Sequence, residues 1–193
     1  MDRMETPSLL LRKAFFADLN AIYKNVWSDE KLAEYMYWEP ETSYQKAAER
    51  LQKTIIYQRE NMAYFVCRKE TDEVIGFAGL RKVNEQVYGE SGICIASRWQ
   101  NHGYGKEILE VLIKYAFEEL LAVEFVYSYV RENERSRRLC MHWPFRYLSS
   151  SEEVRERDGK RLTIDSYVLG KEDYLYVQKE GAKQWKSKRK DWY

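Results

Sequence analysis

Apolar residues recur along this chain with two different periods, and the change between them separates predicted helices from predicted strands. Between residues 41 and 60, Ala47, Leu51 and Ile55 are four positions apart, which predicts a surface helix with one buried stripe behind a Thr or Ser cap. The same periodicity predicts helices at 17–27, 29–37, 103–120 and 134–142. The helix at 103–120 also carries charges spaced for i,i+4 ion pairs.

Short runs rich in β-branched and aromatic residues predict the strands, at 8–14, 63–68, 73–80, 87–97, 123–130, 145–157 and 161–169. The polar turn KETDE and the turn DGK each have hairpin length, so two antiparallel hairpins are expected. The helix at 103–120 lies between two strands and completes a strand–turn–helix–strand unit. The order of elements therefore predicts an α+β, or mixed α/β, fold.

Composition narrows this picture to a globular protein. With 193 residues, 45% of them hydrophobic, the chain can bury a core, so we expect a single domain over 1–178 followed by a basic tail at 179–193 that contains Trp185 and Trp192. The net charge of +1 provides no overall attraction to a polyanion or a membrane. Three cysteines without C-x-x-C spacing argue against a disulfide framework and structural zinc. No signal peptide or membrane span is recognisable, so a cytoplasmic location is expected.

The stretch SRWQNHGYGKEIL, residues 97–109, is the strongest candidate for a binding site. A glycine-rich turn before a helix leaves backbone N–H groups free, and the helix dipole adds positive potential, which together suit a phosphate. A P-loop would need glycine where Gln100 stands, and the dinucleotide-binding fingerprint would need glycine where Ile108 stands. Neither ATP-type nor dinucleotide-type binding is predicted.

What remains is Q-x-x-G-x-G, formed by Gln100, Gly103 and Gly105, which resembles the coenzyme A pyrophosphate signature of the GNAT superfamily of N-acetyltransferases. Other segments resemble the subgroup of ribosomal-protein-alanine N-terminal acetyltransferases (RimJ/RimL-like), and the resemblance covers roughly residues 8–175. The matching positions, in chain order, are Glu90, Gly92, Ile95, Asn133, Ser136, Leu139, Phe145, Asp158, Gly159 and Asp165. The chain departs from the pattern at Pro144, where the family has glycine, and at Cys140, where many relatives carry tyrosine.

The resemblance implies a central, mostly antiparallel twisted sheet of about seven strands with helices on both faces. It implies acetyl-CoA as the acyl donor and no metal. The cofactor-binding residues it implies fall into three groups. The first is Ile93, Cys94 and Ile95, which act through their backbone. The second is the glycine-rich turn, called the cradle below, with Gln100, Asn101, His102, Gly103, Tyr104, Gly105 and Lys106, and the third is Asn133 and Ser136 downstream. Arg135, Arg137 or Arg138 could contact the phosphate on the coenzyme's ribose, although a solvated basic face is the commoner explanation.

Acyl transfer to an amine needs a base, donors for an oxyanion and a proton for the leaving thiolate. Glu90 is the candidate base, also explicable as an exposed strand charge. Ser136 and Cys140, four residues apart on one helix face, are candidate acids, with a buried structural cysteine or solvent as alternatives. Trp38 is a candidate wall of the acceptor pocket or a core residue, and Glu90 also belongs to the candidate acceptor site.

The expected activity is acetyl-CoA-dependent N-acetylation of a primary amine by direct attack in a ternary complex, with a protein or peptide N-terminus as acceptor. A small-molecule amine acceptor, such as a polyamine, amino acid or antibiotic, remains open. A non-catalytic module that binds acyl-CoA or RNA is a further alternative, in which the basic tail binds a polyanion. A monomer or homodimer is expected, with no membrane partner and with nucleic acid contacts limited to the tail.

Overall fold

The structure is a computed structural model that describes residues 3–180. Its residues form two compact units, which are considered separately. The first contains residues 3–81, 90–113 and 155–160, and the second contains residues 82–89, 114–154 and 161–180. The predicted tail at 179–193 lies outside the described residues from position 181 onward.

The first unit is built on five strands: β1 (Arg3–Glu5), β2 (Leu9–Arg12), β3 (Ala63–Arg68), β4 (Val74–Asn84) and β5 (Val87–Ile95). They neighbour one another in chain order, and the β1–β2, β2–β3 and β3–β4 pairs are antiparallel. The last three residues of β4 and the first three of β5 belong to the second unit. The hairpin predicted around the KETDE turn is therefore confirmed.

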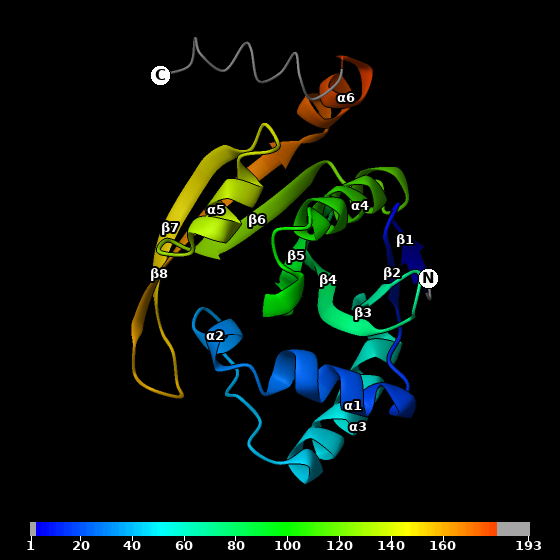
Figure 1. The fold of residues 1–193 in the computed structure, drawn as a ribbon. Coiled ribbons are helices and arrows are strands. Elements are labelled where there is room, and N and C mark those ends of the chain that lie inside the picture. The colour runs from blue at the N-terminus through cyan, green and yellow to red at the C-terminus, as the bar shows by residue number, and fades with distance from the viewer. Residues whose placement is uncertain (1–2, 181–193) are drawn as a thin grey trace. The chain divides into compact units, whose positions relative to one another are not determined.

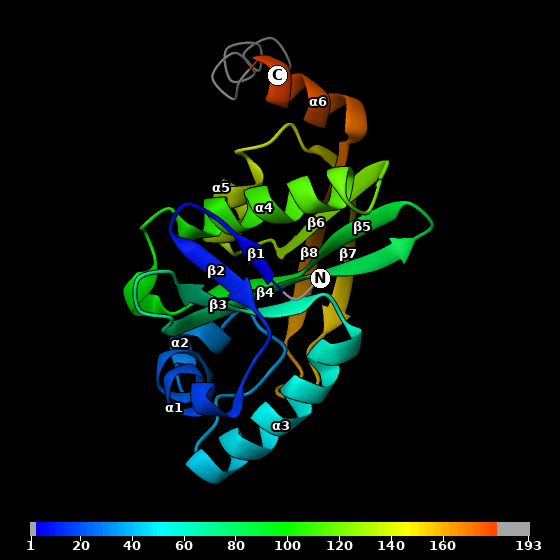
Figure 2. The ribbon, with the colours of Figure 1, turned by 90° about the vertical axis from the view of Figure 1, so that its right-hand side faces the viewer.

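Helices accompany this sheet, and Figure 2 shows α1 and α3 together beside strands β2 to β4. Their bounds are α1 (Leu19–Ile22), α2 (Glu30–Ala33), α3 (Tyr44–Glu60) and α4 (Tyr104–Glu118), the last of which enters the second unit after Ile113. Ser43 caps α3 by accepting the N–H of Lys46 at 3.2 Å, as the sequence predicts. A core of helix and strand side chains packs here, including Trp27, Leu51, Phe65 and Cys94.

The second unit holds β6 (Glu124–Val130), α5 (Glu134–Cys140), β7 (Arg146–Val154), β8 (Arg161–Gly170) and α6 (Lys171–Glu180). The beginning of β5 pairs with β6 in parallel, as a strand–helix–strand crossover requires. The pairs β6–β8 and β7–β8 are antiparallel, which confirms the predicted closing hairpin. Figure 1 shows α5 lying over these strands.

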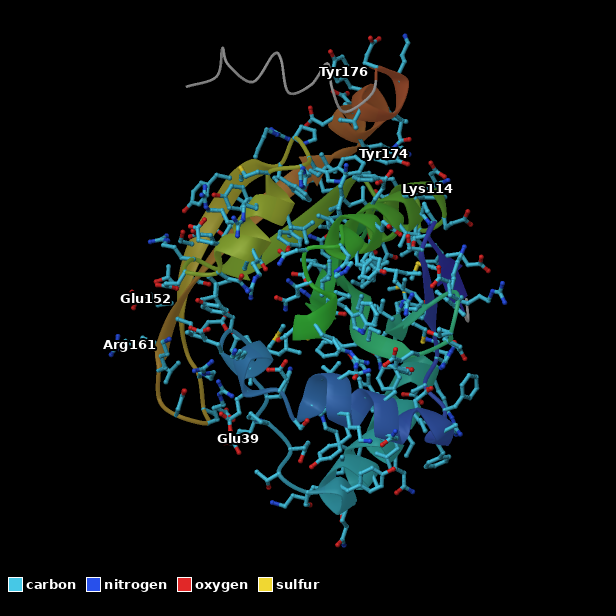
Figure 3. All side chains as sticks on the ribbon, viewed as in Figure 1. Glu39, Lys114, Glu152, Arg161, Tyr174 and Tyr176 are labelled. Atoms are coloured by element: carbon cyan, nitrogen blue, oxygen red, sulfur yellow. The ribbon has the colours of Figure 1, made fainter. Side chains whose placement is uncertain are left out.

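A ladder of aromatic rings runs across the second unit. Tyr167 on β8 is directly opposite Tyr127 on β6 and Tyr147 on β7, and its ring stacks on Tyr129 with centroids 5.6 Å apart. Farther along the hairpin, Glu152 and Arg161 form an exposed ion pair at 3.7 Å, visible at its edge in Figure 3. The ladder stabilises the strands, whereas an exposed pair of this kind contributes little.

Together the pairings give an eight-stranded sheet in the order β1-β2-β3-β4-β5-β6-β8-β7, so the mostly antiparallel mixed α/β fold is confirmed. The eighth strand is the short β1, and α6 is a helix that the apolar pattern did not predict. The predicted helix at 17–27 is wrong in detail, because it is divided into a 3-10 turn (Phe16–Asp18), α1 and a π-helix (Tyr23–Trp27). The helix predicted at 29–37 shortens to Glu30–Ala33.

Hydrogen bonds made by Ser28 and Asn25 accompany the π-helix. The N–H and the hydroxyl of Ser28 both donate to the carbonyl of Tyr23, at 3.0 and 2.9 Å, which closes a turn one residue wider than an α-helical one. The Asn25 side chain within this turn donates to the carbonyl of Val74 on β4 at 2.7 Å. Polar bonds to a strand distant in sequence therefore replace the regular helical pattern.

Candidate functional site

The glycine-rich segment forms a compact turn between β5 and α4. A 3-10 turn (Ser97–Trp99) comes first, and the Gln100 side chain then donates to the carbonyl of Ile95, at the end of β5, at 2.9 Å. His102 Nδ1 lies 2.8 Å from the carbonyl oxygen of Gln100, and its ring stacks on that of Tyr104. Gln100 therefore shapes the turn through its side chain rather than leaving that side chain free.

Backbone conformation in this turn suits an anion. Asn101 and Gly103 have φ values of +66° and +84°, and nothing lies within 4 Å of where a Cβ of Gly103 would be. The hydrogen bonds of residues 3–180 leave the backbone N–H groups of positions 101–105 without an acceptor. Since these groups stand at the N-terminus of a 15-residue helix, they can bind a phosphate. The predicted cradle residues, including Gly105 and Lys106, are thus consecutive in one turn.

The first turn of α4 is fixed to the β1–β2 connection through Glu107. Its carboxylate accepts the hydroxyl of Thr6 at 2.6 Å and, at 3.0 Å each, the N–H and the hydroxyl of Ser8. The negative charge is therefore satisfied by three donors at the start of the helix. The sequence pattern did not identify this anchor, because its partners are about a hundred residues away.

Strand β5 carries the other predicted site residues of the first unit. Gly92 has a φ of +109°, which marks an irregularity in the strand, and its N–H donates to the Glu90 carboxylate. Glu90 is 9% exposed, so the candidate base is a largely buried carboxylate and not an exposed strand charge. Cys94 is buried in the core, and this burial raises the pKa of its thiol to about 12, so its part in any site is through its backbone.

Next to Glu90 along β5, Ser91 belongs to the wall of a pocket of about 220 Å³. Trp38, predicted from the sequence as an acceptor-site residue, also lines it, so the structure brings Trp38 and the β5 segment to one place. The lining residues are Trp27, Trp38, Arg50, Thr54, Tyr57, Gln58, Ala63, Tyr64, Phe65, Phe77, Ala78 and Ser91. The sequence analysis missed Arg50, although a charge three positions after the buried Ala47 on the α3 stripe was a signal.

The segment that carries Trp38 is held by two arginines of the turn between β7 and β8. Arg157 donates to the carbonyls of Ala33 and Trp38 at 2.7 and 2.8 Å, and Arg155 donates to that of Glu34 at 2.6 Å. All of these residues belong to the first unit. Because carbonyls at a helix C-terminus attract cations, this turn stabilises the short α2 and positions Trp38.

The remaining predicted residues belong to the second unit and lie on or beside α5. Asn133 caps the helix by accepting the N–H of Ser136 at 3.2 Å, while Arg137 pairs with Glu134. Ser136 is half-buried, but Cys140 is 0% exposed. A thiol without access to solvent is a poor candidate for an acid that must meet a substrate, so the geometry favours Ser136 over Cys140.

The described residues contain no group of three or more His, Cys, Asp or Glu side chains arranged to hold a metal ion. Within residues 3–180, no helix combines the length and the apolar character that crossing a bilayer requires.

Comparisons with known proteins show to which family this chain belongs. The profile of the acetyltransferase (GNAT) domain matches residues 8–146. The chain belongs to the GNAT acetyltransferase family. It is therefore an acyltransferase, and members of this family use acetyl-CoA as the acyl donor.

Individual relatives of this GNAT chain differ in their acceptors. The uncharacterised N-acetyltransferase p20 of Bacillus licheniformis is 26% identical over 177 residues, which cover 90% of this chain and 99% of that protein. The RimL ribosomal L7/L12 α-N-protein acetyltransferase is similar in structure, with a TM-score of 0.73, 16% identity and coverage of 88% and 94%. The spermidine N-acetyltransferase of Vibrio cholerae, solved with CoA and spermine, has a TM-score of 0.69, 20% identity and coverage of 86% and 98%. At such identities the structural matches establish the fold alone.

Proposed function

We propose that this protein transfers an acetyl group from acetyl-CoA to the amino group of a protein or peptide N-terminus by direct attack in a ternary complex. The observation that carries the proposal is the cradle at 101–105, whose backbone N–H groups lack acceptors within residues 3–180, directly after the strand that carries the buried Glu90. The resemblance to RimJ/RimL-like enzymes supports an N-terminal acceptor.

The cradle fits a coenzyme pyrophosphate because it offers backbone donors, a helix N-terminus and a glycine at positive φ with open space where a side chain would be. Residues 100–106 would hold the phosphates. The backbone of Ile93, Cys94 and Ile95 would hold the pantetheine arm, and the family resemblance also implies Asn133 and Ser136 as cofactor-binding residues. Acetyl-CoA supplies an activated acyl group as a thioester.

In the proposed reaction, Glu90 accepts a proton from the attacking amine, directly or through water. A new N–C bond forms at the carbonyl carbon, and the carbon–sulfur bond breaks. The backbone N–H of Cys94 or Ile95 donates to the oxyanion that develops meanwhile. The departing thiolate takes its proton from Ser136 or from solvent, since Cys140 is buried.

A thiol-release assay with acetyl-CoA tests this function. The acceptors are peptides with different N-terminal residues, the same peptides with blocked N-termini, spermidine and an aminoglycoside. We expect thiol release and mass addition of one acetyl group with free N-termini, and none with blocked ones. Turnover restricted to spermidine or the aminoglycoside would replace the N-terminal acceptor with a small molecule. Coenzyme binding without turnover of any amine would favour a non-catalytic module.

A further inference from the structure

The pocket beside β5 contains a cation in an aromatic setting. The guanidinium carbon of Arg50 lies 4.7 Å from the ring centroid of Trp27 and 4.9 Å from that of Trp38. Its side chain is 24% exposed. Two indole faces therefore stabilise the charge in a place where few water molecules reach it.

Arg50 is poorly satisfied by the protein itself. A guanidinium carries five N–H donors, yet within the described chain its one hydrogen-bond acceptor is the carboxylate of Glu41, at 3.4 Å. Burial lowers the pKa of Arg50, and the Glu41 carboxylate opposes this effect only partly. Trp38 contributes a second unmet donor, because its buried Nε1 has no acceptor among residues 3–180. A buried donor without an acceptor, as at Trp38 Nε1, is costly, and Arg50 has N–H groups that Glu41 does not occupy, so an anionic ligand would accept hydrogen bonds from both.

The charge of the pocket discriminates between classes of acceptor. None of its lining residues is acidic. An ammonium group that entered the pocket would be repelled by the Arg50 guanidinium and would find no carboxylate in the lining. A carboxylate would instead form charge-assisted hydrogen bonds with the planar guanidinium, whose geometry matches its own.

The size of the pocket fits part of an acceptor. At about 220 Å³ it falls below the roughly 300–1,000 Å³ of complete small-molecule sites, so it suits one side chain or one terminal group. Its wall includes Ser91, the residue after Glu90 on β5. A group bound in the pocket therefore lies beside the strand that also carries Glu90.

We propose that this pocket selects acceptors bearing a carboxylate close to the reacting amine, which Arg50 binds in the company of Trp38. The inference rests on the proposed acetyltransferase function and adds to it the chemistry of the acceptor. An acidic first residue of a peptide and the carboxylate of a free amino acid both provide such a group. Polyamines do not.

Matched acceptor pairs test the proposal. Two peptides differing only in Asp or Asn at the first position isolate the carboxylate, and glycine against glycinamide does the same for a free amino acid. We expect kcat/KM to be about 10- to 100-fold higher for the carboxylate member of at least one pair, the range for hydrogen bonds to a charged group. The pair that responds identifies the source of the carboxylate.

Two variants separate recognition from a structural role of the ion pair. Arg50→Gln should reduce the preference to about one, and its far-UV circular dichroism and thermal unfolding report whether the protein is folded. Glu41→Gln removes the competing anion and should preserve or increase the preference. If Arg50 only stabilised the fold through Glu41, both variants would lower turnover of both pair members alike, and the proposal would be overturned.

Binding of products keeps this test independent of turnover. Trp27 and Trp38 line the pocket, so the N-acetylated products of both acceptor pairs can be titrated by tryptophan fluorescence. Tighter binding of the carboxylate product of at least one pair by wild type, lost in Arg50→Gln, supports the proposal even without observed catalysis. Equal binding within both pairs, or wild-type turnover without preference in either pair, overturns it. In the latter case the acetyltransferase function itself stands.

Discussion

Glu90 and Gly92 show how one irregular strand position can orient a carboxylate. The positive φ of Gly92 turns its N–H to the Glu90 carboxylate, so a largely buried acid gains a backbone donor. A carboxylate placed in this way is held in one orientation. In the proposed function, this carboxylate is the group that accepts a proton from the incoming amine.

Replacing Glu90 by Gln tests the base directly. We expect kcat to fall by about 10²- to 10⁴-fold, the usual contribution of a general base, while coenzyme binding stays the same because the cradle is untouched. Glu85→Gln, in the exposed turn between β4 and β5, is the matched control. Steady-state kinetics over a range of pH provide the measurement. An unchanged pH–rate profile in Glu90→Gln would show that another group is the base.

The cradle glycine permits a test with an internal control. Gly103 and Gly159 have φ values of +84° and +67°, and at neither residue does an atom lie within 4 Å of the point that a Cβ would occupy. Alanine at either site should cost about 1–2 kcal/mol of stability through backbone strain. Only Gly103→Ala should also weaken coenzyme A binding, measured by calorimetry. Equal coenzyme affinity in the two variants would contradict the cradle assignment.

Among the elements, α4 connects the cradle to the sheet through Glu107. Its carboxylate receives three hydrogen bonds from Thr6 and Ser8, so the start of the helix is fixed to the β1–β2 connection. Glu107→Ala leaves these donors unmet and should lower the free energy of unfolding by about 1–3 kcal/mol, measured by urea denaturation. Glu110→Ala, on the exposed face of the same helix, should change it little. Equal losses in both variants would show that the anchor contributes nothing specific.

An ion pair between Arg131, the residue after β6, and Asp165 on β8 has an effect that depends on pH. Arg131 donates to both oxygens of Asp165, at 2.7 and 3.0 Å, and thereby lowers the pKa of that carboxyl below its usual value of about 3.9. A carboxyl whose pKa is lower in the folded state stabilises the folded protein at pH values above the pKa of the unfolded state. This stabilisation is lost as the pH falls through the pKa of the folded state.

Asp165→Asn should therefore reduce the loss of stability as the pH falls below about 4, because the group that gains a proton on unfolding is absent. Thermal unfolding at several pH values measures this slope. Glu152→Gln serves as the control on the same hairpin, since its exposed pair with Arg161 contributes little. A slope that changes equally in both variants would assign the effect to net charge.

At the scale of the whole molecule, the cradle, Glu90 and the Arg50 pocket are all formed by residues between 27 and 107, with Asn133 and Ser136 farther along the chain. Every residue assigned a role precedes position 180. The basic stretch of the tail is therefore not needed by any proposed contact.

Deletion of residues 181–193 should leave kcat and KM of the thiol-release assay unchanged within about twofold. Retention on a nucleic-acid column, with and without salt, is measured in parallel. Loss of turnover would show that the tail takes part in the reaction. Salt-dependent retention by the full chain that disappears on deletion would instead support a polyanion contact made by the tail.

The sequence alone determined most of the strands, helices α3 to α5, the glycine-rich turn before α4 and the family. These depend on local periodicity, on glycines in a fixed spacing and on caps such as Ser43, all of which are properties of neighbouring residues. Prediction from the sequence failed where contacts with distant residues override the local preference for a helix or a strand. The π-helix depends on Asn25 reaching β4, and β1 is too short to have a period of its own.

Only the tertiary structure decided which chemistry each candidate residue can perform. Burial made Glu90 a largely enclosed carboxylate and Cys140 an inaccessible thiol, and it placed Arg50 between two indoles. Burial, pKa and hydrogen-bond satisfaction are set by residues far away in the chain, such as those that bring α3 against β3 and β4. A linear pattern records which groups are present, whereas the folded environment decides their charge and their access to a substrate.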